Sequence, residues 1–333
     1  MMLHGGNIYK YAKELDCDPK EIIDFSSNIN AYHSQKAISL SEDLIRKYAN
    51  SDYPELKTTL AENYKTDVKN IALFNGATAA IYALFASLKG KKVYLYAPLY
   101  GEYEKAALAN NKDIYKINRI EDIDAEVDKK SIVVFVNPST PEGSFYDLED
   151  LFLEWKSKKC TVVLDESFIE FEAHKSLKKH INDYKRLYII QSLTKFYACP
   201  GVRIGAIFSN KKNIRSLTTP LWNISSFDTA FIQERLGDAD FKRASHKMHL
   251  EQKEELQMIL KNSQLFDRIV ESEANFILTQ SSHAIEIFKH LLAHKILVRS
   301  CESFDYLDAS WIRFAVKDKA SHQKLQEALS AFA

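Results

Sequence analysis

The middle of the chain alternates short, strongly apolar segments with longer amphipathic ones. The apolar segments are rich in β-branched and aromatic residues and cover residues 93–97, 132–136, 161–164, 187–191 and 204–208. Between them, residues 100–110 and 148–158 repeat apolar side chains at helical spacing. Strands that alternate with helices form βαβ units, which build parallel sheets. The sequence therefore predicts an α/β fold with a mostly parallel central sheet flanked by helices.

The pattern changes after about residue 220. It predicts a long charged helix over 241–261, strands over 275–279, 296–299 and 311–316, and helices from Ala284 and at the end of the chain. This mixture predicts a smaller α+β C-terminal domain. We expect residues 1–45 to form an N-terminal arm and part of this small domain, 46–220 a large domain, and 221–333 the small domain itself. Because no low-complexity linker separates them, the two domains should pack closely.

Charge and hydropathy argue against two classes of partner. The 45 basic and 45 acidic residues cancel, and no dense basic run occurs, so we expect no nucleic acid partner. No apolar stretch approaches the roughly 20 residues that span a bilayer. The N-terminus also lacks an apolar signal segment. We therefore expect no membrane partner and a cytoplasmic location.

Two pairs of histidines have the spacing of metal ligands on a helix. His246 and His249 form one pair, and His290 and His294 form the other. Neither pair has a nearby carboxylate in a ligand pattern. We interpret both as solvated helix faces and predict no metal site.

Lys195 lies in a predicted loop between two apolar segments. Loops at strand ends are where α/β folds place their chemistry. The hydroxyls of Ser192 and Thr194 and the guanidinium of Arg203 could bind a phosphate, and a desolvated amine can form a Schiff base. Taken alone, the motif also fits an ordinary solvated loop lysine. The alternative is a lysine that holds a phosphorylated aldehyde, and the motif alone does not favour it.

Three further segments supply complementary groups. Gly76 and Ala77, followed by Thr78, should open a helix whose free N–H groups can bind a phosphate. Tyr100 follows a predicted strand and could stack on a heteroaromatic ring. Asp165 closes another strand and could pair with a protonated pyridine nitrogen. Each has an ordinary alternative in a turn, in packing or in a helix cap, but together they meet the requirements of one cofactor, pyridoxal 5′-phosphate (PLP).

With these motifs the chain resembles the fold-type I PLP enzymes of the class I/II aminotransferase group along nearly its whole length. The resemblance implies the fold type I of PLP-dependent transferases, with 46–220 as the PLP-binding domain. It implies three catalytic residues: Lys195 as the Schiff-base lysine, Asp165 as the ring-nitrogen partner and Tyr100 as the stacking ring. The groups implied around the cofactor phosphate are Gly76, Ala77, Thr78, Ser192, Thr194 and Arg203. Tyr53 is implied to reach that phosphate from the other subunit, which implies a homodimer with shared active sites.

Two positions depart from the common pattern of the group. Thr140, within the segment 137–143, stands where an asparagine normally bonds the 3′-oxygen of the cofactor. Phe168 stands where many relatives carry a tyrosine that bonds the same atom. We keep Thr140 among the cofactor-binding residues, because its hydroxyl or a water could supply the missing hydrogen bond.

Within the group, the ends of the chain resemble the threonine-phosphate decarboxylases of cobalamin biosynthesis and the related histidinol-phosphate aminotransferases. The segments that lean towards the decarboxylases are 4–7, 24–30, 165–171 and 296–304. The resemblance implies that Arg313 binds the α-carboxylate of a substrate. Arg299, with His4 and Asn28, is our candidate for binding a substrate phosphate, since guanidinium groups bind phosphate bidentately. Structural salt bridges are the alternative for both arginines.

Three functions follow from these observations. The preferred one is a PLP-dependent decarboxylase of a phosphorylated amino acid, L-threonine O-3-phosphate or a close analogue such as serine phosphate. The second is a PLP-dependent aminotransferase that acts on histidinol phosphate or a similar phosphorylated amine. The third is a non-catalytic PLP-fold binding protein. The first two need the same groups and differ in which bond to Cα breaks, and no single residue in the sequence decides between them.

Overall fold

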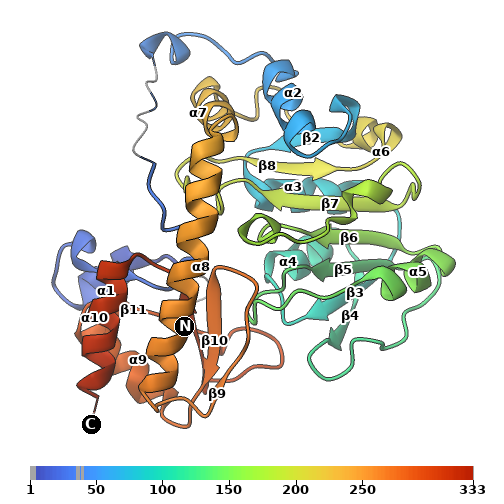
Figure 1. Ribbon diagram of the computed structural model, residues 1–333. Helices are drawn as coiled ribbons and strands as arrows, with labels where there is room; N and C mark the ends of the chain where they lie inside the picture. Colours follow the sequence, from blue (N-terminus) through green and yellow to red (C-terminus); the bar gives the residue numbers. More distant parts are fainter. Residues whose placement is uncertain (1–4, 35–37, 39–40, 333) are drawn as a thin grey trace.

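A seven-stranded sheet forms the centre of the large domain (Figure 1). The computed structural model describes residues 5–34, 38 and 41–332. The strands of the large sheet are β2 (Ile71–Phe74), β3 (Lys92–Ala97), β4 (Asp113–Asn118), β5 (Ile132–Val136), β6 (Thr161–Asp165), β7 (Leu187–Ser192) and β8 (Gly205–Phe208). Their order is β2-β8-β7-β6-β5-β3-β4. Only the pairings of β8 with β2 and β7 are antiparallel, so the predicted mostly parallel sheet is confirmed.

Helices cover both faces of this sheet. They are α2 (Pro54–Asn63), α3 (Gly76–Ser87), α4 (Glu102–Ala109), α5 (Glu149–Ser157), α6 (Lys211–Ser216) and α7 (Ser226–Leu236). Phe85 of α3 and Tyr103 of α4 belong to the core on one face, whereas Leu60 of α2 and Trp155 of α5 belong to the core on the other. Because the central strands are buried on both faces, their sequences are continuously apolar rather than alternating.

The small domain contains an antiparallel sheet of order β12-β13-β10-β9. Its strands are β9 (Arg268–Ile269), β10 (Phe276–Gln280), β12 (Arg299–Ser300) and β13 (Trp311–Ala315). A second, parallel pair joins β1 (Ile23–Asp24) to β11 (Ile296–Leu297). The helices of this domain include α1 (Ile8–Glu14), α9 (Ala284–Ala293) and α10 (Lys319–Ser330).

The prediction of a single strand over residues 296–299 is wrong. Ile296 and Leu297 pair with β1, whereas Arg299 and Ser300 pair with β13 in the other sheet. Between them, Val298 is fully buried in the small-domain core. The continuous apolar sequence therefore conceals a crossing from one sheet to the other, which periodicity cannot detect.

Helix α8 (Ala239–Asn262) runs from the large domain into the small one (Figure 1). Phe241 at its start belongs to the large-domain core, and Leu256 and Leu260 near its end belong to the small-domain core. Short 3₁₀ turns complete the secondary structure: η1 (Pro19–Glu21), η2 (Glu42–Leu44), η3 (Val68–Asn70), η4 (Ile169–Phe171) and η5 (Leu177–His180). Among the described helices, none combines the length and the apolar character that a bilayer crossing requires.

The histidine pair on α8 differs from its prediction. His249 is buried rather than solvated, because this face of α8 packs against the large domain, where the ring of Phe171 lies 5.2 Å from the imidazole. On the second pair, His290 Nε2 lies 2.8 Å from the carbonyl oxygen of Ala328. The interpretation of these pairs as solvated faces is therefore wrong for His249.

Candidate active site

A cavity of about 300 Å³ opens at the carboxyl ends of the large-sheet strands, between the two domains. Most of the predicted site residues line it: Asn28, Ala77, Thr78, Tyr100, Thr140, Asp165, Ser192, Thr194, Lys195, Arg203, Arg299 and Arg313. Gly5, Ser26 and Phe304 also contribute. The fold thus brings together segments from the start, the middle and the end of the chain.

Lys195 projects from the loop after β7 into this cavity. The residue as a whole is only partly covered because it faces the cavity, whereas its amine lies deep among protein atoms. This burial, together with the positive charge of Arg313, lowers the pKa of Lys195 to about 8. Its backbone oxygen accepts a hydrogen bond of 3.0 Å from the amide of Asn30. The backbone of Lys195 is therefore anchored, and a minor fraction of its amine is neutral near pH 7.

Asp165 ends β6 and is 6% exposed. One carboxylate oxygen accepts a hydrogen bond of 2.7 Å from the hydroxyl of Tyr103, and the other accepts one of 2.9 Å from the amide of Ser167. Burial dominates and raises the pKa of Asp165, although these two hydrogen bonds and the charge of Lys195 oppose the rise. The carboxylate is thus oriented as a hydrogen-bond acceptor inside the cavity.

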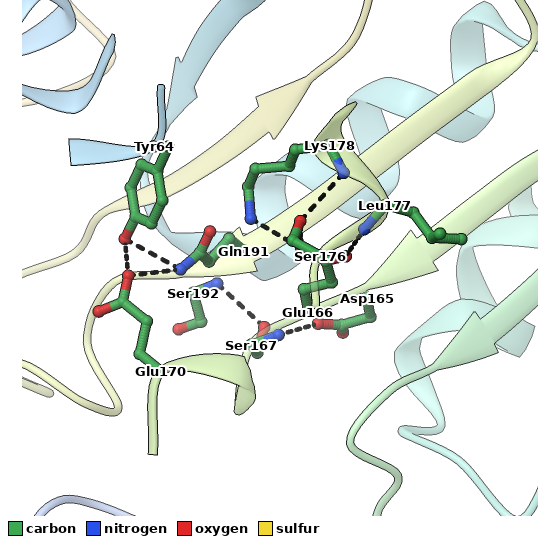
Figure 2. A network of polar contacts seen from close by, with 10 residues as sticks. All are labelled: Tyr64, Asp165, Glu166, Ser167, Glu170, Ser176, Leu177, Lys178, Gln191 and Ser192. Carbon is green, nitrogen blue, oxygen red and sulfur yellow. Dashed lines mark hydrogen bonds and ion pairs between the residues drawn. The ribbon is translucent and has the colours of Figure 1, made fainter. Parts of the chain in front are cut away.

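Neither Tyr103 nor Ser167 was predicted from the sequence. Tyr103 lies in the first turn of α4, three residues after Tyr100, and its amide donates to the carbonyl oxygen of Tyr100 at 3.1 Å, so its proximity to the site was detectable in principle. The hydrogen bond from the amide of Ser167 to the side chain of Asp165 closes a short turn of a kind that aspartate commonly forms with the residue two positions later. Ser167 also accepts a 2.9 Å hydrogen bond from the amide of Ser192, which ties the end of β6 to the end of β7 (Figure 2).

Behind Asp165, the next residue along the chain anchors the same strand end (Figure 2). Glu166 is 1% exposed and accepts hydrogen bonds from Lys178 Nζ at 2.7 Å and from the hydroxyl of Ser176 at 2.6 Å. The amide of Leu177 donates to its other oxygen at 3.0 Å. Since each carboxylate oxygen has a donor and the charge is paired, the buried ion pair is satisfied. It fixes the backbone that carries Asp165.

The start of α3 fits a phosphate group. Gly76 has φ of +82° and opens the helix, and the side chain of Asn75 does not cap it. A Cβ atom on Gly76 would lie 2.5 Å from a terminal nitrogen of Arg203, so glycine is what allows the guanidinium to approach the helix start. The hydroxyls of Ser192 and Thr194 lie 3.0 Å apart in the same cavity. Free helix N–H groups, a guanidinium and two hydroxyls are the donors that a phosphate requires.

Thr140 and Tyr100 complete the cofactor side of the cavity. The hydroxyl of Tyr100 lies 3.2 Å from Thr78 Oγ1. Thr140 Oγ1 accepts a hydrogen bond of 3.0 Å from Arg313, so its own hydrogen remains available to donate. Phe168, which replaces the usual tyrosine, packs edge-on against Phe276 at 5.1 Å. These residues fit the predicted cofactor, although Phe168 offers it no hydrogen bond.

Arg299 and Arg313 face each other across the β12–β13 pair and are 2% and 6% exposed. Arg313 also donates to the carbonyl oxygen of Ser26 at 3.2 Å, and Arg299 donates to the hydroxyl of Ser303 at 2.7 Å. Burial lowers the pKa of Arg313 to about 10. Within residues 5–34, 38 and 41–332, Arg313 has no carboxylate within 4.0 Å. The structural salt bridge considered for Arg313 is therefore absent there, and the two like charges favour a bound anion.

The N-terminal segment supplies the remaining wall. Asn28 lines the cavity, is 6% exposed, and its side-chain oxygen is buried without a hydrogen-bond partner. Such an atom is typical of a position that meets a ligand or a water. His4, predicted beside it, lies outside the described residues.

Tyr53 does not line this cavity. Its hydroxyl donates to Asn223 Oδ1 at 3.0 Å and accepts from the amide of Ile224 at 3.1 Å, both in its own chain. The predicted contact of Tyr53 concerns the cavity of a second subunit, which a single chain does not test. It stays a prediction.

An unpredicted ion pair positions Thr140. Arg119, fully buried, donates to both carboxylate oxygens of Glu142, at 2.6 and 2.8 Å, and to the carbonyl oxygen of Thr140 at 3.1 Å. A bidentate guanidinium–carboxylate pair restricts geometry in two directions. The loop 137–143 is thereby held where Thr140 meets Arg313.

Comparisons with known sequences point to one family. The family model "Aminotransferase class I and II" matches residues 20–332. The adenosylcobalamin biosynthesis bifunctional protein CobDQ of Leptospira interrogans is 31% identical over 98% of this chain, and the chain spans only 40% of that protein's length. The threonine-phosphate decarboxylase of Salmonella typhimurium is 26% identical, over 98% of this chain and 95% of its own.

Solved structures share the fold. The histidinol-phosphate aminotransferase from Clostridium acetobutylicum superposes with a TM-score of 0.79 at 26% identity, over 92% of this chain and 97% of its own. The L-threonine-O-3-phosphate decarboxylase from Porphyromonas gingivalis gives 0.77 at 24% identity, over 87% and 91%. From the family match and the cavity that bears its motifs, we conclude that this chain belongs to the class I and II aminotransferase family and is a PLP-dependent enzyme.

Proposed function

We propose that the enzyme decarboxylates a phosphorylated amino acid, L-threonine O-3-phosphate or a close analogue such as serine phosphate. One observation carries this proposal. Among the described residues, four cationic side chains line the cavity, those of Lys195, Arg203, Arg299 and Arg313, against one carboxylate, that of Asp165. The phosphate of PLP accounts for part of this excess. A substrate with both a carboxylate and a phosphate would account for the rest.

In this proposal, different residues on the cofactor side of the cavity bind different parts of PLP. When bound, PLP supplies an electron sink for the pair left at Cα. Asp165 would accept the hydrogen bond of the ring nitrogen and stabilise its positive charge, and Tyr100 would stack on the ring. Thr140 would donate to the 3′-oxygen. The phosphate would be held by the donors at Gly76, Ala77, Thr78, Ser192, Thr194 and Arg203.

The substrate side would bind through its two arginines. Arg313 would bind the α-carboxylate, since its Nε is buried without a hydrogen-bond partner and is available to a bidentate ligand. Arg299, with Asn28 and His4, would bind the phosphate. Binding both ends fixes which bond to Cα is presented for cleavage.

Lys195 would transfer the proton that the reaction requires. Loss of CO₂ breaks the bond between Cα and the carboxylate carbon, leaves the electron pair at Cα, and requires one proton to be delivered there. With a pKa of about 8, the amine exists in both protonation states near neutral pH and can donate or accept that proton.

The second candidate is transamination of histidinol phosphate or a similar phosphorylated amine. It is favoured by the likeness to the aminotransferase from Clostridium acetobutylicum, whose fold covers 92% of this chain. The same residues would serve, but the Cα–H bond would break and an amino acceptor would be needed.

A direct assay separates the two candidates. The PLP-loaded enzyme is incubated with threonine phosphate, serine phosphate or histidinol phosphate, with and without 2-oxoglutarate. We expect CO₂ and the corresponding amine from threonine or serine phosphate without 2-oxoglutarate. A keto product that forms only with 2-oxoglutarate, and no CO₂, would replace decarboxylation by transamination.

We also propose a homodimer in which Tyr53 reaches the cofactor phosphate of the partner subunit. The support is a group of exposed apolar side chains near α2 and α7: Ile45, Tyr48, Leu221, Trp222 and Phe227. The rings of Tyr48 and Trp222 stack at 4.4 Å, and Ser226 donates to the carbonyl oxygens of Leu44 and Lys47, so the two segments are adjacent. Exposed patches of this kind mark association surfaces.

Light scattering during size-exclusion chromatography tests the dimer. We expect twice the chain mass for the native protein and a monomer for Trp222→Asp. Mixing inactive Lys195→Ala chains with Tyr53→Phe chains should then restore one intact site per mixed dimer. A monomeric native enzyme with full activity would contradict the proposal.

The division of the chain at residues 45 and 220 and a cytoplasmic location remain parts of the proposal. The separate apolar cores support a division into two domains, but Ile232, Leu236 and Phe241 of the large-domain core lie beyond residue 220. Limited proteolysis tests the first, and cell fractionation tests the second.

A further inference from the structure

A cluster of potential metal ligands lies outside the active-site cavity. One ligand atom each from Glu172, His174 and Glu273 lie within 4.8 Å of one another. Glu172 and His174 belong to the segment between η4 and η5, and Glu273 belongs to the loop between β9 and β10. The cluster therefore joins the large domain to the small one.

His174 is the informative member of the cluster. Its side chain is 8% exposed, yet its Nε2 is buried and has no hydrogen-bond partner. The nearest carboxylate oxygen, Glu273 Oε2, is 3.7 Å away, which is too far for a hydrogen bond. The ring stacks on Phe145 at 4.0 Å with an interplanar angle of 7°, so its orientation is held. A fixed, buried imidazole nitrogen without a partner requires an explanation, and an ion between it and the carboxylates is one.

Glu172 has the surroundings of a metal ligand. Lys253 Nζ donates to its Oε1, and His249 Nε2 lies 3.7 Å from the same atom. The carboxylate is thus oriented by outer partners, as ligating carboxylates are in known sites. The positive charge of Lys253 also limits how tightly a cation can bind.

We propose that Glu172, His174 and Glu273 bind a divalent transition-metal ion of the zinc type and so connect the two domains. An imidazole with two carboxylates suits zinc, whereas magnesium prefers oxygen ligands alone. A cavity of about 510 Å³ that Glu172 and His174 help to line gives the ion access from solvent. The sequence predicts no metal here because Glu273 is distant along the chain from the other two ligands.

The bound ion would hold a loop of the active site in position and would take no part in the reaction itself. The amide of Glu273 donates to the carbonyl oxygen of Gly143 at 2.8 Å. Gly143 ends the loop that presents Thr140 to Arg313. An ion bound by Glu273 would therefore steady the contact between this loop and the small domain. We expect a higher melting temperature with the ion bound and a small change in substrate KM.

Titration of the metal-free, PLP-loaded enzyme with zinc chloride against a chromogenic chelator tests the site. We expect saturable binding of one ion per chain with a micromolar Kd and a rise in melting temperature. His174→Phe keeps a ring that can stack on Phe145 but removes the ligand nitrogen, and should weaken binding at least tenfold. Glu273→Gln, which changes a half-exposed side chain, should also weaken it.

His290→Phe is the matched control. It also removes an imidazole, but one on helix α9 whose Nε2 already has the carbonyl oxygen of Ala328 as partner. Zinc binding should stay unchanged in this variant. If His174→Phe fails to fold, Glu273→Gln decides. Absence of saturable binding, or equal binding in the native enzyme and both ligand variants, would overturn the proposal.

Discussion

The cavity has two halves that are built in different ways. In the cofactor half, Asp165 ends β6, and Tyr100 and Lys195 follow β3 and β7 within a few residues. The connectivity of one sheet thus places them together. In the substrate half, Asn28 comes from near the start of the chain, and Arg299 and Arg313 come from near its end. Their meeting depends on how the N-terminal segment packs on the small domain.

Long-range contacts hold the substrate half. The amide of Ala315 donates to the carbonyl oxygen of Phe25 at 2.8 Å, and Lys317 Nζ donates to that of Ser27 at 3.1 Å. These bonds lie outside the large sheet, so changes in them can alter substrate binding while the cofactor half stays intact. The division between the halves is therefore open to experiment.

The largest expected effect comes from Lys195 in the cofactor half. Lys195→Ala should lower kcat by roughly 10²–10⁴-fold, because it removes both the covalent attachment and the proton-transferring amine. It should also abolish the visible absorbance of the lysine-bound cofactor. Circular dichroism would check that the fold is retained. A fully active variant would sink the proposed mechanism.

The next effect isolates the substrate half. Arg313→Lys keeps the charge but loses the bidentate fork, and should lower kcat/KM by about 10- to 100-fold, as expected for lost hydrogen bonds to a charged group. The Kd of PLP, measured by absorbance titration, should change far less, because the only described hydrogen bond from Arg313 to the cofactor half is the one to Thr140. Arg268→Lys, at an exposed position of β9, is the control. Equal losses of substrate and cofactor binding in Arg313→Lys would contradict the division of the cavity into two halves.

The third effect tests the pKa of Lys195 in the cofactor half, through the pH dependence of the rate at which its amine bonds to the cofactor. Because burial lowers the pKa of Lys195 to about 8, the attacking amine is mostly protonated below this pH and mostly neutral above it. The rate at which the apoenzyme forms its lysine-bound cofactor should rise about tenfold between pH 7 and 9. Stopped-flow absorbance would measure it. A rate that keeps rising towards pH 10 would indicate an unperturbed lysine.

The smallest effect tests a residue that supports the cofactor half without facing the ligand. Tyr103→Phe removes one hydrogen bond to Asp165, which raises the pKa of that carboxyl and should weaken PLP binding about three- to tenfold. The pH midpoint of the bound cofactor's absorbance should move as well. Tyr82→Phe, which removes a 3.1 Å bond to Glu102 on the neighbouring helix, is the control. A loss of stability alone, without a spectral shift, would reduce Tyr103 to a packing residue.

The sequence predicted much of the fold and of the cofactor half. Apolar runs located the central strands, and the expected helix start at Gly76 is confirmed. The contacts that complete the site were not predicted, as with Tyr103 on Asp165, Arg119 on Glu142 and Thr140 on Arg313. Each of these joins segments that periodicity treats independently.

Local periodicity and turn chemistry were enough to establish the alternating strands and helices, and with them the positions of Lys195, Asp165 and Tyr100 at strand ends. That follows because parallel strands expose their carboxyl ends at one edge. Tertiary packing alone decided that β11 and β12 belong to different sheets, that His249 is buried, and that Arg299 and Arg313 form a pair. Those outcomes depend on contacts between distant segments, whose free energy is not encoded in any one stretch of sequence.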